Sequence, residues 1–408
     1  MFGHENLNIN SAVIKVMGVG GGGCNAVNSM IESNISSAQF FAINTDNQAL
    51  LLSKADNCIQ IGSKLTKGLG AGSDPNIGEA AAEESKDDIA SQLEGTDLLF
   101  IAAGMGGGTG TGAASVIARI AREMGILTVA VVTKPFSFEG RVRNENANKG
   151  IMNLKKYVDT LVVIPNDKLL QYLPAQTGML DAFKVADDML KQGIVGIVEL
   201  IATPSLINLD FADVNTVMRN QGLAHMGIGR AKGENRIIEA VRQAVSSPLL
   251  ETTIEGAKSV ILNVTGGKDL MLNEVSEAAN LVQGIIDSSA NIIFGATIDD
   301  SMVDEVKITV IATGFTAKGE EQDDIIELKS VIADTKPEPK PTDSSVLPLV
   351  FKIEEEERRL QEEAKAVEKV EEPLPDPIME KIEQELNNEP KQPKGKELPA
   401  FMRKLFKK

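Results

Sequence analysis

A glycine-rich segment at residues 104 to 112, GMGGGTGTG, is the feature that most limits what this chain can form. It follows an apolar strand pattern at residues 97 to 103 and precedes a helical pattern that begins near Ala113. Without Cβ atoms, its glycines let the main chain approach a phosphate, while Thr109 and Thr111 supply hydroxyl groups and the helix N-terminus favours negative charge. The segment therefore predicts a phosphate-binding loop in a nucleotide-binding protein.

A second glycine loop, GVGGGGCN at residues 18 to 25, also lies between a strand pattern and a helix pattern. Alone it matches the dinucleotide fingerprint, with Asp46 at the ribose-binding position, so a dinucleotide-dependent oxidoreductase is an alternative. Two phosphate loops at the carboxyl edge of one sheet favour a triphosphate instead. A third segment, GLGAGSDP at residues 68 to 75, is expected to close over the terminal phosphate. The sequence lacks the P-loop motif with its lysine, which excludes a P-loop NTPase.

Short apolar strands alternate with helical patterns in the first half of the chain. The strand patterns are AVIKVMGVG, FFAIN, DLLFIAAG, LTVAVVT and TLVVIP. Continuous apolar runs indicate parallel strands buried on both faces, so we expect an α/β fold with a doubly wound, mainly parallel sheet over residues 11 to 178. A long central helix at 179 to 207 leads to a smaller α/β domain at 208 to 315. That domain has a helix near 236 to 245 and the strands SVILNVTG, NIIFGATID and KITVIATG.

Net charge and rare residue types exclude several classes of function. The formal net charge of −17 at pH 7 opposes contact with a phosphate backbone, so no nucleic-acid partner is expected. Two cysteines exclude a disulfide framework or a Cys-rich zinc site, and two histidines leave little material for a Ser-His-Asp triad. The first ten residues, expected to be flexible, contain no signal-peptide pattern, and no apolar run approaches about 18 residues. We therefore expect a cytoplasmic protein without a transmembrane segment.

Composition changes after Phe315. Nine of the 16 prolines lie between residues 316 and 396, where 13 Lys or Arg face 22 Asp or Glu, so this acidic stretch is expected to be a disordered linker. The last residues, 397 to 408, place apolar and cationic side chains together in ELPAFMRKLFKK. This segment favours a peptide that binds a membrane-tethered partner, with direct membrane contact or plain disorder as alternatives.

The two glycine loops together resemble the signature of the tubulin superfamily, and residues 11 to 315 are similar to its FtsZ family of bacterial cell-division GTPases. Further similar segments are FFAINTD, GLGAG, TKPFSFEG, DAFKVAD and NLDFADV. The resemblance implies a protein that binds GTP or GDP with Mg²⁺ and hydrolyses GTP. It also implies assembly of the chain with itself, head to tail, into the cytokinetic ring at midcell on the inner face of the membrane. Residues Leu398 to Phe406, which contain LPAF, look like the family's peptide for membrane-tethered division adaptors.

The resemblance also implies roles for residues at matching positions. The residues implied to bind the phosphates are Gly20, Gly21, Gly22, Gly104, Gly107, Gly108, Thr109 and Gly110, and those implied to lie near the terminal phosphate are Ala71 and Gly72. The residues implied to contact the sugar and the neighbouring phosphate are Thr133, Glu139 and Arg143. Those implied to bind guanine are Asn25, Asn166 and Asp187, with Phe183 stacked on the base. The chemistry of Asp187 agrees, because guanine offers N1–H and an exocyclic amine to a carboxylate whereas adenine lacks that donor pair.

Two acidic residues, Asp210 and Asp213, follow the long helix in the segment that also contains Asn208. A helix of about 27 residues spans roughly 40 Å, so it carries these carboxylates away from a nucleotide bound near its start. The resemblance makes them catalytic, with Asn208 shaping their loop, so they must serve the nucleotide of a neighbouring subunit. Such a head-to-tail contact is heterologous and generates filaments. A nucleotide-binding scaffold without hydrolysis, with both acids in a surface turn, is the alternative.

Overall fold

The computed structural model describes residues 12–33, 35, 37–170, 176–202, 206–207, 209–246, 254, 256–286 and 290–315. Four sequence predictions fall outside the described residues: the flexible residues 1 to 10, Asn208, the linker at 316 to 396, and the tail peptide with Leu398 to Phe406. None of the described helices is long and apolar enough to cross a membrane.

One sheet of ten strands runs through the described residues in the order β3-β2-β1-β4-β5-β6-β7-β10-β8-β9. The strands are β1 (Ile14–Val19), β2 (Gln39–Asn44), β3 (Asn57–Gln60), β4 (Leu98–Gly104), β5 (Leu127–Lys134), β6 (Thr160–Pro165), β7 (Gly222–Lys232), β8 (Ser259–Gly266), β9 (Asn291–Ile298) and β10 (Glu305–Thr313). All neighbours from β3 to β7 are parallel, β10 is antiparallel to both β7 and β8, and β9 is parallel to β8. The expected mainly parallel α/β fold is confirmed.

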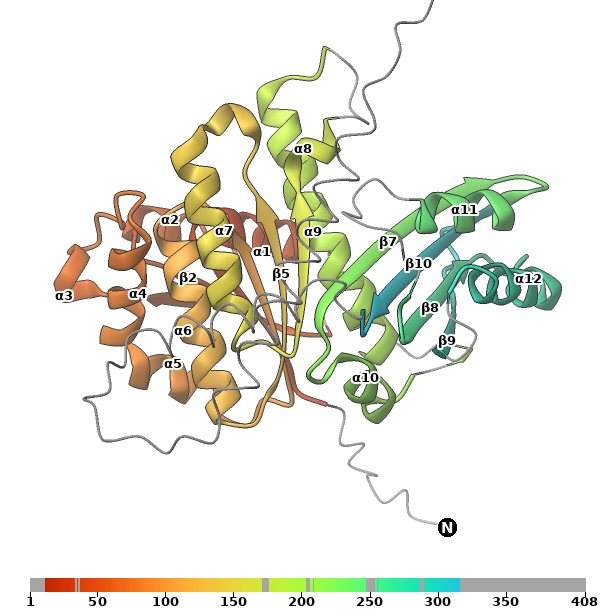
Figure 1. Ribbon diagram of the computed structural model, residues 1–408, viewed down its shortest axis with the longest axis horizontal. Coiled ribbons are helices and arrows are strands. Elements are labelled where there is room, and N and C mark those ends of the chain that lie inside the picture. The colour runs from red at the N-terminus through yellow and green to blue at the C-terminus, as the bar shows by residue number, and fades with distance from the viewer. Residues whose placement is uncertain are drawn as a thin grey trace, which may run out of the picture. The chain divides into compact units, whose positions relative to one another are not determined.

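Helices cover both faces of this sheet (Figure 1). They are α1 (Gly20–Glu32), α2 (Asn47–Leu51), α3 (Ser63–Thr66), α4 (Pro75–Glu84), α5 (Lys86–Leu93), α6 (Thr109–Glu123), α7 (Arg141–Lys155), α8 (Asn166–Leu169), α9 (Met179–Ala202), α10 (Phe211–Met218), α11 (Arg236–Val245) and α12 (Leu272–Gln283), with a 3-10 turn η1 (Ser137–Glu139). Helix α6 begins at Thr109 rather than near Ala113, because Gly108 is its N-cap and the loop's last residues form its first turn.

The parallel strands separate two apolar cores, which explains their uninterrupted hydrophobic runs. Along β1, Val16 faces the core beneath α1 and α9, while Met17 and Val19 face the core beneath α4, α5 and α6. Each of these side chains is fully buried, which contributes roughly 1.5–3 kcal/mol per large apolar side chain. The rigid sheet formed in this way holds the loops at its carboxyl edge in fixed positions.

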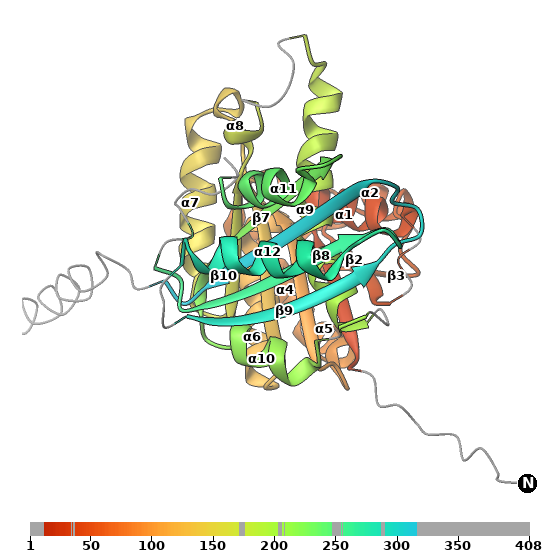
Figure 2. The same ribbon diagram turned by 90° about the vertical axis from the view of Figure 1, so that its right-hand side faces the viewer.

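The last four strands carry α11 and α12 on one face, with a core of their own beneath them (Figure 2). Strand β7 joins the two halves of the sheet through parallel pairing of Gly222 to Ala224 with β6. Glycine is required further along β7, because a Cβ at Gly227 or Gly229 would lie 1.9 Å from a carbonyl oxygen of α11. Helix α11 therefore packs directly on the main chain of β7.

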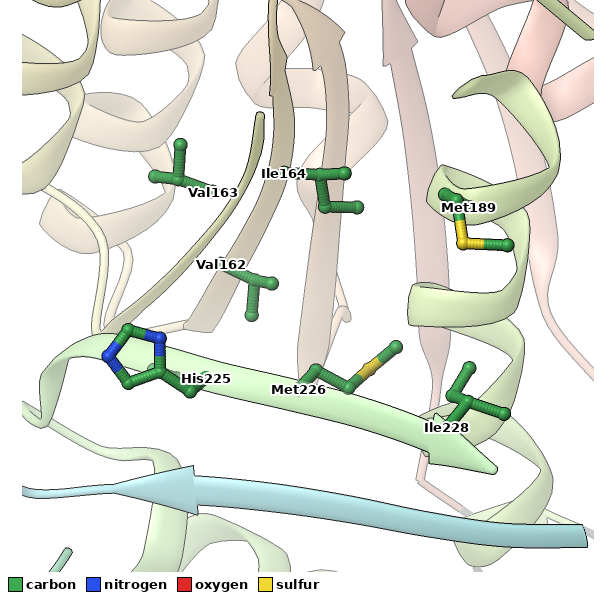
Figure 3. A pocket seen from close by; sticks show the side chains of 8 residues that line it. Val162, Val163, Ile164, Met189, His225, Met226 and Ile228 are labelled. Carbon is green, nitrogen blue, oxygen red and sulfur yellow. The ribbon is translucent and has the colours of Figure 1, made fainter. Parts of the chain in front are cut away.

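Side chains from β6, α9 and β7 line a small, mostly apolar cavity of about 20 Å³ (Figure 3). Met189 of α9 and Met226 of β7 are among its lining residues, and His225 forms an edge-to-face contact with Phe315, their ring centroids 4.5 Å apart. A space of this size holds about one water molecule. This cavity at the junction of the two halves is therefore too small to hold a nucleotide.

Helix α9 is the longest described helix and connects two edges of the sheet. It ends at Ala202, five residues before the expected end at residue 207, and its 24 residues span about 36 Å. Figure 1 shows α8 near one end of α9 and α10 near the other. The described residues fall within one compact unit, and the expected domain boundaries within it stay a prediction.

Candidate nucleotide site

A cavity of about 220 Å³ lies at the carboxyl edge of the parallel strands. Its lining comes from the segments after β1, β4, β5 and β6 and from the first turns of α9. The lining residues are Gly21, Gly22, Gly104, Met105, Gly107, Gly108, Thr109, Gly110, Thr133, Pro135, Glu139, Arg143, Asn166, Phe183, Ala186 and Asp187. In a doubly wound sheet, this edge is where ligands bind.

The two glycine loops meet main chain to main chain at the floor of the cavity. Gly20 has a φ of +71°, and a Cβ at this position would lie 2.7 Å from the Gly110 nitrogen, so no side chain fits between the loops. At Gly21 and Gly107, by contrast, a Cβ would meet no protein atom within 4 Å. These two glycines therefore leave open space against the main chain, which is the room that a phosphate needs beside backbone N–H groups.

Glu139 and Arg143 form an ion pair at the rim of the cavity. The Glu139 carboxylate accepts a hydrogen bond from the Phe136 backbone N–H at 2.9 Å and lies 3.0 Å from Arg143 Nε. The Glu139 side chain is 11% exposed and that of Arg143 48% exposed. The carboxylate is therefore fixed in place, while the guanidinium stays accessible to an anionic ligand.

Three aromatic rings hold the segment after β5 against α9. Phe136 stacks on Phe138 with ring centroids 5.1 Å apart, and Phe183 meets both rings edge-on, at 5.4 and 6.4 Å. Phe183 also lines the cavity and is 37% exposed, so part of its surface remains open to a ligand. An exposed aromatic ring in a cavity wall is a natural surface for stacking a base.

Asp187 and Asn166 supply hydrogen-bond acceptors from neighbouring elements. Burial, reinforced by the negative charge of Asp188, raises the pKa of Asp187 to about 7. Asn166 is 5% exposed, and its Oδ1 is a buried acceptor without a hydrogen-bond partner among the described residues. A ligand with N–H donors would supply hydrogen bonds to both acceptors, and guanine carries two such donors, N1–H and an exocyclic amine.

The structure brings 13 of the 17 sequence-predicted ligand residues together in this cavity. Of the other four, Gly20 contacts the second glycine loop, and Ala71 is buried against Gly108, at which a Cβ would lie 2.8 Å from the Ala71 Cβ. Gly72 has a φ of +56° and faces open space. Asn25 is exposed on α1 and is absent from the lining, so its role as a guanine reader stays a prediction.

Three lining residues escaped the sequence prediction: Met105, Pro135 and Ala186. Met105 follows Gly104 and Ala186 precedes Asp187, whereas Pro135 lies in the segment TKPFSFEG between Thr133 and Glu139. Proximity in the sequence to predicted residues was the available signal. Asp46, the residue that suggested a dinucleotide site, instead caps α2, where its carboxylate accepts from the Gln48 N–H at 2.9 Å.

Asp210 and Asp213 lie at the opposite edge of the sheet. Asp210 is the N-cap of α10, and its carboxylate accepts from the Asp213 N–H at 2.9 Å, with both residues exposed. Helix α10 is anchored at the amino end of β6, where the Thr160 hydroxyl donates to the Met218 carbonyl, whereas Asn166 at the carboxyl end of β6 lines the cavity. The two acids therefore cannot reach a nucleotide in the same molecule.

Comparisons with known proteins agree with this geometry. Residues 13–174 match the description "Tubulin/FtsZ family, GTPase domain", and residues 222–316 match "FtsZ family, C-terminal domain". An empty FtsZ dimer from M. jannaschii is 48% identical, with a TM-score of 0.73 over 76% of this chain and 90% of that one. Because that relative comes from M. jannaschii, the bacterial origin implied by the resemblance stays a prediction.

Two more distant structures share the fold. CetZ2 from Haloferax volcanii, a GTPγS-bound protofilament, is 19% identical, with a TM-score of 0.66 over 79% of this chain and 98% of that one. CetZ1 from the same organism, a GDP-bound monomer, is 22% identical, with a TM-score of 0.66 over 78% and 99% of the two chains. With the family match over both halves of the described sheet, the chain belongs to the tubulin/FtsZ family of GTPases, in its FtsZ branch.

Proposed function

We propose that this chain is a GTP-dependent, polymer-forming protein of cell division, whose subunits hydrolyse GTP to GDP where one molecule meets the next. The observation that carries the proposal is the separation of two half-sites. The glycine loops, Asn166 and Asp187 surround a cavity at one edge of the sheet, and Asp210 and Asp213 lie exposed at the other. Stacking the two edges head to tail brings the halves together.

The local structure of α10 suits carboxylates that meet a partner. Asp210 is oriented by its bond from the Asp213 N–H, while Asp213 lies in the first helical turn with its carboxylate exposed. In the proposed interface these groups orient the water that attacks the terminal phosphate of the neighbour's GTP. Asn208, outside the described residues, is proposed to shape the same loop. The CetZ2 protofilament with GTPγS is a protein of this fold that assembles with nucleotide.

Mg²⁺ is proposed to enter with the nucleotide. No group of three or more His, Cys, Asp or Glu side chains in the described part of the chain is arranged to hold a metal ion. The Glu139 carboxylate in the cavity already has two partners, Arg143 and the Phe136 N–H. The cavity therefore suits a Mg²⁺ ion whose ligands are mainly phosphate oxygens and water. When bound in this way, Mg²⁺ neutralises charge on the phosphates.

The cellular part of the proposal rests on the family and on the sequence of the tail. We place the polymer in the cytoplasm, at the division site on the inner face of the membrane, as a cytokinetic ring. Residues Leu398 to Phe406 are the proposed contact with membrane-tethered adaptors, because they join apolar side chains to Arg403 and Lys404 on a long acidic tether. Deletion of residues 397 to 408 should leave GTPase activity and filaments intact and abolish midcell localisation.

The dependence of GTPase rate on protein concentration tests the shared site. A site completed by a neighbour gives a rate per molecule that rises steeply at the assembly threshold, and a self-contained site gives a flat one. Asp213→Ala should still bind GTP and assemble, as followed by light scattering, but should release phosphate at least tenfold more slowly. Wild-type turnover in the Asp210→Ala/Asp213→Ala double variant would contradict the proposal.

A further inference from the structure

A buried hydroxyl lies behind the phosphate loop. Thr45 follows β2 directly and is 0% exposed, and its Oγ1 lies 2.7 Å from Oγ1 of Thr109. Thr109 is the first residue of α6 and lines the cavity. Thr109 therefore contacts both Thr45 and the space in which phosphates are expected.

Phosphate binding would fix the direction of the hydrogen bond between these two hydroxyls. Each hydroxyl carries one proton, and an ionised phosphate oxygen can only accept. If the Thr109 hydroxyl donates to a phosphate, the bond at 2.7 Å must run from Thr45 to Thr109. A chain of this kind polarises each member, and its last bond is charge-assisted.

The main chain of Thr45 holds a second element near the same place. Its carbonyl oxygen accepts hydrogen bonds from the Gly70 N–H at 3.4 Å and from Thr66 Oγ1 at 3.3 Å. The next residue after Gly70 is Ala71, which is buried against Gly108 of the phosphate loop. One residue thus joins the segment expected over the terminal phosphate to the loop expected beneath the phosphates.

We propose that Thr45 is a positioning residue for the nucleotide: its hydroxyl donates to Thr109 and leaves the Thr109 proton for a phosphate oxygen. Thr45 itself does not touch the ligand. The inference rests on the proposed function, because it requires the phosphates of GTP or GDP to occupy this cavity.

Three variants test this role by calorimetric titration with GDP, at protein concentrations too low for assembly. Thr45→Val keeps the shape of the side chain and removes the hydroxyl, so the Kd for GDP should rise about tenfold. Thr45→Ser restores the hydroxyl, and its Kd should stay within about twofold of wild type. The matched control is Thr128→Val, which removes another fully buried hydroxyl, one that donates to the Ile126 carbonyl at the amino end of β5; its Kd should not change. Thermal unfolding without nucleotide checks that each variant folds.

A double-mutant cycle separates positioning from packing. In a Thr109→Val background, Thr45→Val should change the Kd less than about twofold, because the hydroxyl through which Thr45 acts is gone. An equal tenfold loss in both backgrounds, or an equal loss in Thr45→Ser and Thr45→Val, would overturn the inference. An unchanged Kd in Thr45→Val, with wild type binding GDP normally, overturns the inference alone. A wild-type protein that binds neither GDP nor GTP overturns the proposed function as well.

Discussion

Asp187 should make guanine-nucleotide binding depend on pH. Burial, and then the charge of Asp188, raises the pKa of this carboxyl from 3.8 to about 7 in the free protein. Guanine donates N–H bonds that need the ionised carboxylate, so below pH 7 a proton competes with the base. Affinity should therefore fall as the pH falls through 7, and binding at pH 7 should release protons.

The structure sets the size of this effect. With a pKa of about 7, the carboxylate is about nine tenths ionised at pH 8 and about one tenth ionised at pH 6. The affinity for GDP should therefore fall about tenfold between pH 8 and pH 6, provided that the bound guanine keeps Asp187 ionised throughout. At pH 7 about half a proton should be released per GDP bound.

Titration calorimetry with GDP at pH 6, 7 and 8 measures both quantities, the proton release being obtained from buffers of different ionisation enthalpy. The diphosphate itself titrates near pH 6 and changes the affinity of every variant with pH. The quantity to compare between wild type and Asp187→Asn is therefore the slope of log Kd for GDP against pH. Asp187→Asn should bind about ten- to a hundredfold more weakly than wild type at pH 8 and lose the extra slope. Asp181→Asn makes the same chemical change at an exposed position of α9 outside the cavity, and it should keep the wild-type slope. Equal slopes in wild type and Asp187→Asn would refute the reasoning.

Two further pairs of measurements follow from the geometry. Gly107→Ala places a methyl group in open cavity space, so its melting temperature should stay near that of wild type while GDP affinity falls at least tenfold. Gly112→Ala is the contrast, because its Cβ would lie 2.0 Å from a carbonyl oxygen of α4. This variant should lower the free energy of unfolding by several kcal/mol. Equal stability of Gly107→Ala and Gly112→Ala would contradict the placement of Gly107 against open cavity space. Thr160→Val removes the hydroxyl bond to Met218 that anchors α10 and should reduce the free energy of unfolding in urea by about 1–2 kcal/mol. It should also lower GTPase activity without changing the Kd for GDP, and a weakened Kd with normal GTPase activity would contradict the placement of α10 away from the nucleotide.

Strands buried on both faces and the glycine loops were predictable from the sequence alone. Their signals are local, since an apolar run of six to eight residues followed by several glycines has few other structural solutions. The same holds for Asp187 and Phe183, which occupy neighbouring positions on one face of a long helix pattern.

Other elements could not be predicted, because they are stabilised by contacts with residues that lie far away in the sequence. Strand β7 contains Gly227 and Gly229, which weaken a strand pattern, and the structure shows that they admit the main chain of α11. Strand β3 is a short edge strand, NCIQ, without alternation. The hydrogen bond between Thr45 and Thr109 connects residues that lie 64 positions apart, and no local sequence pattern predicts such a contact.

The most direct test of the shared site mixes two inactive variants. Asp210→Ala/Asp213→Ala keeps the nucleotide cavity and lacks the acids, whereas Asp187→Asn keeps the acids and is assayed at a GTP concentration that leaves its own cavity largely empty. In an equal mixture, about a quarter of randomly formed head-to-tail contacts pair an intact cavity with intact acids. A site shared between neighbouring subunits predicts that GTPase activity rises on mixing above the mean of the two variants measured separately, with about a quarter of the wild-type rate as the upper bound, because contacts at empty cavities form less readily. Activity equal to the mean of the two variants measured separately would contradict the claim that neighbouring subunits complete each other's active site.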